Sequence, residues 1–335
     1  MSTSLPAELA LDTTSLIPPD PEPIMRVASG FMAAKHLFAA SEAGLFAALA
    51  DGPASAEELA TRTGLTPHGA RISANAMVAL GLLETDGDSY RNGPEADFFL
   101  TGKTPADLRP FLLFWDRLSR PAWSDLGDAL RGQAPPRTIA EDETEVFSLG
   151  VESITAAAAH AFAEQPELAS ARRMLDVAGG TGSFITAALH ANAELSGTLV
   201  ELPEVAAIAR RKLADEPRIS VIDADAVRDE LPAGHDLILV ANLVHLLGDD
   251  ENRALVRNLH EPGATLMLVD FWTDPTGTDP VPAALMAGEF LLWSEGRGRS
   301  YAEEEAREWL SEAGWTGIER RPLAGPQSVI VARAG

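Results

Sequence analysis

The second half of the chain alternates short β-rich segments with segments of helical spacing, and this alternation restricts the fold more than any other feature. Five segments rich in Val, Ile and Leu occupy 174–178, 198–202, 219–222, 237–241 and 265–270. Strands that alternate with helices are typical of a parallel sheet flanked by helices. Two further segments, 318–323 and 328–332, are joined by a turn at Gly325-Pro326 and predict an antiparallel end to the sheet.

The N-terminal part has a different pattern. Five prolines among polar residues in 1–23 favour an extended arm, which either wraps a partner or has no fixed structure. Apolar residues at helical spacing over 25–49 then predict a pair of core helices.

The next segment predicts a winged-helix arrangement. Ser55-Ala56-Glu57-Glu58 is a capping box, and Thr66-Pro67 offers a second helix start. Asp86-Gly87, inside the alternating segment 82–92, predicts a hairpin. In DNA-binding proteins the second helix of such a module can enter the major groove.

Charge argues against nucleic acid. The chain has 26 Lys and Arg against 50 Asp and Glu, a net charge of −24. The segment 55–95 holds three basic and six acidic residues, where a DNA-binding module needs a positive footprint. A negative field repels phosphate backbones and anionic lipid head groups, so we expect neither nucleic acid nor a membrane as partner.

Composition permits two domains and excludes cysteine chemistry. The 335 residues are 46% hydrophobic and include no cysteine, so disulfides and thiolate metal sites are excluded. The histidines show no paired ligand spacing, and we expect no metal. The first basic residue is Arg26, and no apolar run reaches the roughly 18 residues of a bilayer span, so we expect a soluble, cytoplasmic protein.

The middle of the chain is rich in aromatic residues. The segment 107–132 predicts two helices, and 133–144 is a polar linker. We therefore divide the chain into an N-terminal arm at 1–23, a winged-helix domain at 24–104, a helical linker and pocket region at 105–172, and a sheet domain at 173–335.

A glycine-rich turn comes directly after the first predicted strand. Asp176-Val177-Ala178-Gly179-Gly180-Thr181-Gly182 leads into a helix at Ser183, and its glycines permit a tight turn and close approach of a ligand to the backbone. Ile185 stands where a dinucleotide fingerprint has its third small residue, which weakens the alternative of a nicotinamide dehydrogenase.

Two acids sit where a nucleoside would need them. Glu201 ends the second strand and can accept hydrogen bonds from ribose hydroxyls, and Asp225 comes after the third strand and can accept from an adenine amine. Each acid alone is equally compatible with a solvated strand-end cap. Together with the glycine turn they predict a nucleoside site.

On these motifs the chain resembles the S-adenosylmethionine-dependent O-methyltransferases of secondary metabolism, the caffeate and hydroxyindole O-methyltransferase-like family, in its bacterial natural-product branch. DVAGGTGSF at 176–184 is similar to the glycine motif of the family, VELPEV at 200–205 to its ribose motif and DAD at 223–225 to its adenine motif. ANLVHLLGDDE at 241–251 resembles the catalytic segment, and EGRGRSYAEEE at 295–305 the segment after the substrate helix.

The resemblance implies an architecture and an activity. It implies a Rossmann-like class I methyltransferase sheet with an N-terminal winged-helix dimerisation domain, a homodimer, and methyl transfer from S-adenosylmethionine to a hydroxyl. His245 would be the general base, because histidine is largely neutral at pH 7 and can take a proton from a phenol. The cofactor-binding residues it implies are Asp176, Gly179, Gly180, Gly182, Glu201, Leu202, Asp225, Ala226 and Asn242.

The acceptor pocket is predicted from aromatic residues and one helical face. Met286, Glu289 and Trp293 are spaced three and four apart and share that face. Glu289 aligns with the family's acid that orients the histidine; the alternative is a core helix with Glu289 in solvent. Phe114, Trp115, Phe162, Met286 and Trp293 predict binding of a small aromatic intermediate, although each is also compatible with an ordinary core position.

The chain departs from the family pattern at three places. Ala178 replaces a glycine, which requires a negative φ there. Leu246-Leu247 stand where an acid or amide and a tryptophan usually follow the histidine, and a second catalytic acid is not placed. Methylation of carbon or nitrogen by the same fold is the alternative to methylation of oxygen.

Overall fold

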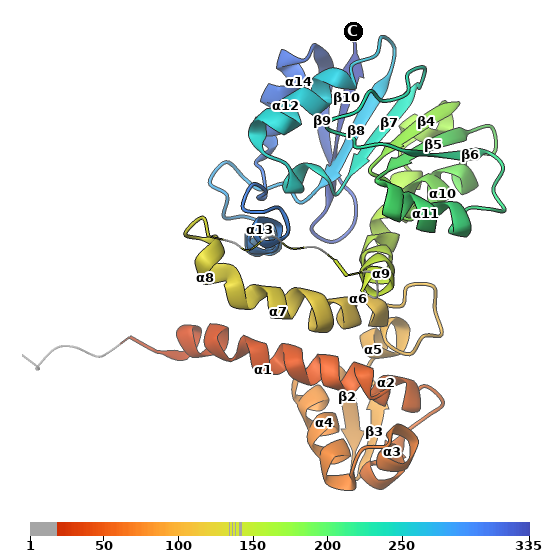
Figure 1. Cartoon of the computed structure of the whole chain (residues 1–335). Coiled ribbons are helices and arrows are strands. Elements are labelled where there is room, and N and C mark those ends of the chain that lie inside the picture. Colours follow the sequence, from red (N-terminus) through yellow and green to blue (C-terminus); the bar gives the residue numbers. More distant parts are fainter. Residues whose placement is uncertain (1–18, 134, 136, 138, 141–142) are drawn as a thin grey trace, which may run out of the picture.

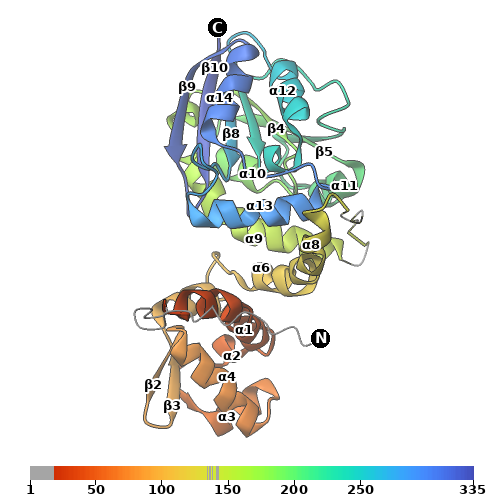
Figure 2. The ribbon, with the colours of Figure 1, turned by 90° about the vertical axis from the view of Figure 1, so that its left-hand side faces the viewer.

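The computed structural model describes residues 19–133, 135, 137, 139–140 and 143–335. Figures 1 and 2 show an N-terminal unit and a sheet domain with a layer of helices between them. Most of the predicted arm lies outside the described residues. Helix α1 (Glu22–Glu42) already begins inside the predicted arm.

The N-terminal unit is the predicted winged helix. After α1 it contains α2 (Leu45–Ala48), β1 (Ala54–Ser55), α3 (Ala56–Thr63), α4 (Pro67–Ala79), β2 (Leu83–Asp86), β3 (Ser89–Asn92) and α5 (Pro94–Phe99). Ser55 and Glu58 form the capping box of α3, and Thr66 caps α4. The three strands pair antiparallel in the order β1-β3-β2.

One nearly continuous helical run replaces the two helices predicted over 107–132. It consists of α6 (Arg109–Phe114), a π-helical turn (Trp115–Ser119), α7 (Arg120–Ala122), a 3₁₀ turn (Trp123–Asp125) and α8 (Leu126–Ala129). In the π turn the amide of Arg120 donates to the carbonyl of Trp115. We call the part from Trp115 to Ala129 the bridging helix, because it lies between the N-terminal unit and the sheet domain (Figure 1).

Helix α9 (Thr144–Ala163) packs along α6 and along α10 (Ser183–Ala191). Within the described part of the chain it is the one helix long and apolar enough to cross a bilayer, judged by length and composition alone. Glu145 and Glu152 interrupt its apolar sequence, so the sequence contains no unbroken apolar run there.

The sheet domain contains seven strands in the order β6-β5-β4-β7-β8-β10-β9. The strands are β4 (Arg173–Val177), β5 (Ser196–Glu201), β6 (Ile219–Asp223), β7 (Leu237–Ala241), β8 (Thr265–Asp270), β9 (Trp315–Pro322) and β10 (Ser328–Ala334). The helices after α10 are α11 (Pro203–Lys212), α12 (Asp249–Asn258), α13 (Val281–Trp293) and α14 (Glu303–Glu312). The first five strands are parallel and β10 is antiparallel to both of its neighbours, which confirms the predicted fold class.

The strand order reverses between β4 and β7. From β4 the chain moves outward through β5 to β6, then returns to β7 on the other side of β4 and continues to β8. Apolar cores cover both faces of the sheet, one around Trp272 and Trp309 and one around Phe162 and Phe184. Ligands of open α/β sheets bind beyond the carboxyl ends of the strands at such a reversal, so the loops after β4 and β7 are where a site is expected.

Candidate active site

The turn after β4 has the backbone that its glycines predict. Gly180 and Gly182 have φ of +58° and +89°, which glycine adopts without steric cost. A Cβ at Gly179 would lie 2.7 Å from the carboxyl carbon of Asp176, whereas a Cβ at Gly180 would meet no atom within 4 Å. The turn is therefore packed closely on its inner side and open on its outer side.

The expected negative φ at Ala178 is wrong. Ala178 has a φ of +53°, in the left-handed region. Its Cβ then crowds the following carbonyl oxygen, which costs roughly 1–2 kcal/mol for an L-residue. Asn242, directly after β7, has a φ of +56°, so the backbone is strained on both sides of the strand reversal.

Asp176 and Glu201 form a pair of acids beneath the turn. Asp176 is fully buried, and neither of its oxygens has a hydrogen-bond partner among the described residues. Burial, and then the neighbouring Glu201 carboxylate, raise the pKa of Asp176 to about 7. Glu201 accepts hydrogen bonds from the amides of Gly180 (2.9 Å) and Leu202 (2.8 Å), while burial raises its pKa.

The other predicted cofactor residues lie around the same end of the sheet. Asp225 accepts hydrogen bonds from the amides of Val227 and Arg228 and so closes the turn that contains Ala226. Leu202 is 47% exposed at the end of β5. The side-chain oxygen of Asn242 accepts a hydrogen bond from the Gln327 amide at 2.5 Å. The strand ends thus bring together all the residues predicted for the cofactor.

His245 lies in a 3₁₀ turn (Val244–Leu246) shortly after β7 and is buried. Its Nδ1 is 2.6 Å from Oδ1 of Asp270, the last residue of β8. A carboxylate can only accept there, so Nδ1 carries the proton and Nε2 keeps a free lone pair. The Phe290 ring stacks on the imidazole at 3.7 Å between centroids.

Sequence reasoning missed Asp270 and Gly298. Asp270 is visible in the sequence as the end of a predicted strand, but only the pairing of β7 with β8 brings it beside the histidine turn. A Cβ at Gly298 would collide with the backbone carbonyl of His245, so only glycine lets the segment after α13 pack against that turn. The motif at 295–305 contains this glycine, but the motif alone does not reveal which backbone it approaches.

Glu289 does not contact the histidine, and it does not point to solvent either. It is 6% exposed and accepts hydrogen bonds from Ser119, Trp123 and Trp293. Both expectations for Glu289 are therefore wrong, because two indole N–H groups and a hydroxyl hold the carboxylate on the side of α13 that faces the bridging helix. Trp293 and Glu289 do share one helical face, as their spacing predicted.

The aromatic residues divide into two sets. Phe114, Phe147 and Trp293 form a continuous wall, with ring centroids 5.5 Å and 6.2 Å apart along the series. Phe162 is fully buried against Phe184 in the core of the sheet domain, so it is not available to an acceptor. Trp115 packs on Phe111 and the core of the N-terminal unit, away from the wall. Met286 is partly buried on α13.

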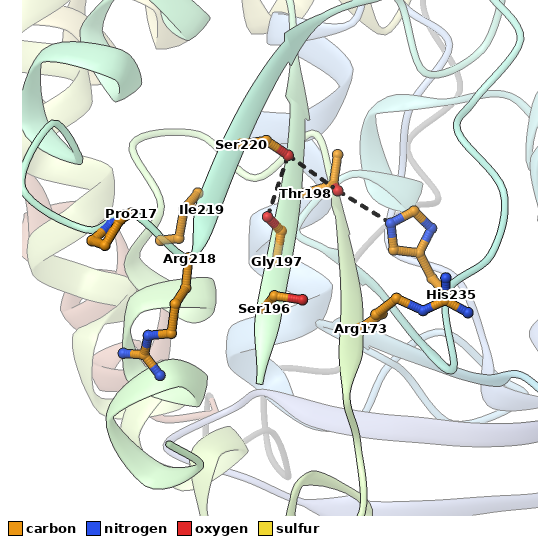
Figure 3. A pocket seen from close by; sticks show the side chains of 9 residues that line it. All are labelled: Arg173, Ser196, Gly197, Thr198, Pro217, Arg218, Ile219, Ser220 and His235. Atoms are coloured by element: carbon orange, nitrogen blue, oxygen red, sulfur yellow. Dashed lines mark hydrogen bonds between the residues drawn. The ribbon is translucent and has the colours of Figure 1, made fainter. Parts of the chain in front are cut away.

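A shallow cavity of about 190 Å³ lies at the opposite edge of the sheet (Figure 3). Its lining includes Arg173 and Ser196 at the amino ends of β4 and β5, and His235 just before β7. Nε2 of His235 lies 3.2 Å from the Thr198 hydroxyl. Because the glycine turn and His245 lie beyond the carboxyl ends, this cavity is separate from the site described above.

No group of three or more metal-binding side chains occurs within the described ranges.

Comparisons with known proteins agree with this geometry. An O-methyltransferase domain model matches residues 136–316, and an O-methyltransferase dimerisation domain model matches 25–102. The chain is 31% identical to 3-hydroxy-5-methyl-1-naphthoate 3-O-methyltransferase of Streptomyces sahachiroi, over 90% of this chain and 91% of that protein. It is 29% identical to the tetracenomycin polyketide synthesis 8-O-methyl transferase TcmO of Streptomyces glaucescens, over 93% and 96%.

The fold also matches solved structures. Human N-acetylserotonin methyltransferase, crystallised with S-adenosylmethionine, superposes with a TM-score of 0.83 at 24% identity, covering 94% of this chain and 97% of that one. The sheet, the helical layer and the N-terminal unit are thus shared over almost the full length.

Ala178→Gly should stabilise the protein. Glycine removes the left-handed penalty but adds entropy to the unfolded chain, so we expect the free energy of unfolding to rise by roughly 0.5–1 kcal/mol. The matched control, Ala187→Gly inside α10, should lower it by a similar amount. Urea denaturation measures both; equal destabilisation by the two variants would contradict strain at Ala178.

Asp176→Asn should change how stability depends on pH. The folded pKa of about 7 exceeds the ordinary 3.8, so the stability that protonated Asp176 contributes is complete below pH 3.8 and is lost as pH rises through about 7. Without added ligand, the Asn variant should therefore be more stable than the parent at pH 8 and lose this advantage towards pH 4. Urea unfolding at both pH values measures this difference in stability, and the exposed Asp215→Asn is the control. If the Asn variant gains stability over the parent as the pH falls, the raised pKa of Asp176 is refuted.

Proposed function

The chain belongs to the O-methyltransferase family, and on that premise we propose that it transfers a methyl group from S-adenosylmethionine to a phenolic hydroxyl of a small aromatic natural-product intermediate, with His245 as general base. The observation that carries the proposal is the buried His245–Asp270 pair beside an open glycine turn. Its acid and base chemistry needs no metal.

The residues at the strand ends fit a positively charged nucleoside. Asp176 offers two buried oxygens without hydrogen-bond partners among the described residues, and a cationic ligand nearby would favour its ionised form. We assign the backbone of Gly179, Gly180 and Gly182 to the approach of the cofactor. The other assignments are Glu201 to the ribose hydroxyls, Asp225 to the adenine amine, Asn242 to the amino-acid end, and Leu202 and Ala226 to apolar contacts with the nucleoside.

When bound, S-adenosylmethionine supplies a methyl group on a positively charged sulfur, which needs no further activation by the protein. His245 Nε2 would take the hydroxyl proton of the acceptor as its oxygen gains the methyl group, and the cofactor would be released as S-adenosylhomocysteine. Asp270 holds the Nδ1 proton in place and stabilises the imidazolium that forms. Residues that hold the acceptor hydroxyl against the methyl donor can contribute about 7–11 kcal/mol through proximity and orientation.

The acceptor class is inferred from the relatives and the aromatic wall. The two Streptomyces relatives are named for a naphthoate and for tetracenomycin polyketide synthesis. Phe147 and Trp293 are partly exposed and offer ring surfaces of the kind that a fused aromatic acceptor packs against, while Phe114 is buried against Phe147. A phenolic product of aromatic polyketide assembly is the acceptor we propose.

We propose a homodimer formed through the N-terminal unit. The chain carries a dimerisation domain at 25–102, and α1 exposes a series of large apolar side chains. Their exposed fractions run from 55% for Met32 to 80% for Val27. A second copy of the chain is the partner that would cover them. A cytoplasmic location is part of the same proposal, because a chain without cysteine needs no oxidising compartment.

His245→Ala should lower kcat by roughly 10²-fold or more, since a positioned general base contributes about that much.

Asp270→Asn should also lower kcat, because the amide of Asn can donate a hydrogen bond to Nδ1 and so moves the imidazole proton to Nε2. The measurement is incorporation of labelled methyl groups into a panel of phenols, amines and activated carbons. The exposed His190→Ala is the control. If His245→Ala turns over at a nearly normal rate and the labelled methyl group is found on a carbon atom, the protein is a C-methyltransferase and the proposed O-methylation is wrong.

Val27→Asp combined with Phe31→Asp should convert the dimer into a monomer, because burial of two carboxylates in an apolar interface is unfavourable. Sedimentation velocity of the full chain gives the mass in solution. Leu130→Asp, at a residue 70% exposed outside the N-terminal unit, should leave the dimer intact. A dimer that survives the double substitution places the interface elsewhere.

A further inference from the structure

A buried carboxylate on α13 has an unusual set of partners. Oε2 of Glu289 accepts from the Ser119 hydroxyl at 2.8 Å and from the Trp123 indole at 2.5 Å, and Oε1 accepts from the Trp293 indole at 2.8 Å. Within the described ranges, no Lys, Arg or His lies within ion-pair distance of Glu289. A buried charge without a counter-charge is tolerated only when neutral donors surround it, and here three do.

These donors come from two different parts of the chain. Ser119 and Trp123 belong to the bridging helix, and Trp293 belongs to α13 itself. Gly288 makes the contact between them possible, because a Cβ there would lie 2.9 Å from the Trp123 ring. One carboxylate therefore fixes the bridging helix against the middle of α13.

Two further residues of α13 contact the His245 imidazole and the aromatic wall. Phe290, next to Glu289, stacks on the His245 imidazole. Trp293, one turn further along, continues the aromatic wall through Phe147. Trp123 lies against Gly288 of α13 and keeps 37% of its surface exposed, so part of its ring remains accessible.

The geometry points to Glu289 as a positioning residue that sets acceptor specificity. Its carboxylate holds the indoles of Trp123 and Trp293 in one orientation and so defines the walls between which a flat aromatic acceptor is placed next to His245. All three of its hydrogen bonds come from protein donors, and we assign Glu289 no proton transfer in the reaction. The inference rests on the proposed function, because it requires an acceptor site beside His245.

Glu289→Gln tests this inference with little change in shape. Whichever way the amide turns, its NH₂ group faces an indole N–H, so one tryptophan loses its acceptor. We expect the KM for the acceptor to rise about 10-fold or more, with a smaller change in kcat, an unchanged pH midpoint of kcat/KM and an affinity for S-adenosylmethionine within about twofold of the parent. The exposed Glu304→Gln serves as the control and should match the parent.

A second variant keeps the test decisive. In a Trp293→Phe background the indole donor is gone, so Glu289→Gln should raise the KM less than it does in the parent chain. The kinetics use whichever acceptor the panel of phenols, amines and activated carbons yields. Equal effects in both backgrounds, an unchanged acceptor KM, or a shifted pH midpoint would each overturn the assignment.

Tryptophan fluorescence separates failure of this inference from failure of the proposed function. Glu289→Gln should shift the indole emission, and the shift should be smaller in the variant that also carries Trp123→Phe and Trp293→Phe. If the parent methylates nothing in the panel, the proposed function fails while the emission still reports on the indoles. An emission spectrum identical to that of the parent would overturn the role of Glu289 whatever the panel shows.

Discussion

The reversal of strand order between β4 and β7 is the constraint on which the site depends. Because all five parallel strands end at the same edge, the residue after each strand is brought to one crevice although these residues are far apart in sequence. The glycine turn comes after β4, Glu201 ends β5, Asp225 comes after β6 and Asp270 ends β8. The helices and the two apolar cores serve to hold this edge in register.

The site buries several acidic side chains in a protein whose net charge is already −24. Each buried acid is compensated differently: Asp270 by the imidazole, Glu201 by two amides, and Glu289 by indoles and a hydroxyl. Among these four acids, Asp176 alone has two side-chain oxygens that both lack a hydrogen-bond partner in the described part of the chain, and burial raises its pKa to about 7. Strain at Ala178 and Asn242 lies on either side of it. Uncompensated charge and backbone strain at one place are typical of a site shaped for a ligand rather than for stability.

Sequence patterns within short segments predicted much of this arrangement. They failed where contacts between segments far apart in the sequence determine the position of a side chain. The strands at 237–241 and 265–270 and the capping box at Ser55 result from short-range rules, and the structure has them at the same residues. Asp270 could not be assigned to His245 because strand neighbours are not readable from one strand. Trp115 packs on the N-terminal core at the start of a π turn, and the extra residue of such a turn shifts the helical phase of the residues after it by about 100°, which the regular helical spacing of a sequence does not reveal.

The bridging helix contacts both the N-terminal unit and the helix that packs on His245. At its start, Asp116 pairs with Lys35 of α1 at 2.6 Å, and Trp115 packs on the core of the N-terminal unit. Asp116 is largely buried and also pairs with Arg120 at 2.8 Å, so this attachment combines a small ion-pair cluster with apolar packing. At its middle, Ser119 and Trp123 hold Glu289, and α13 then places Phe290 on the histidine. One chain of contacts, from Lys35 through the bridging helix and Glu289 to Phe290, therefore joins the N-terminal unit to the imidazole.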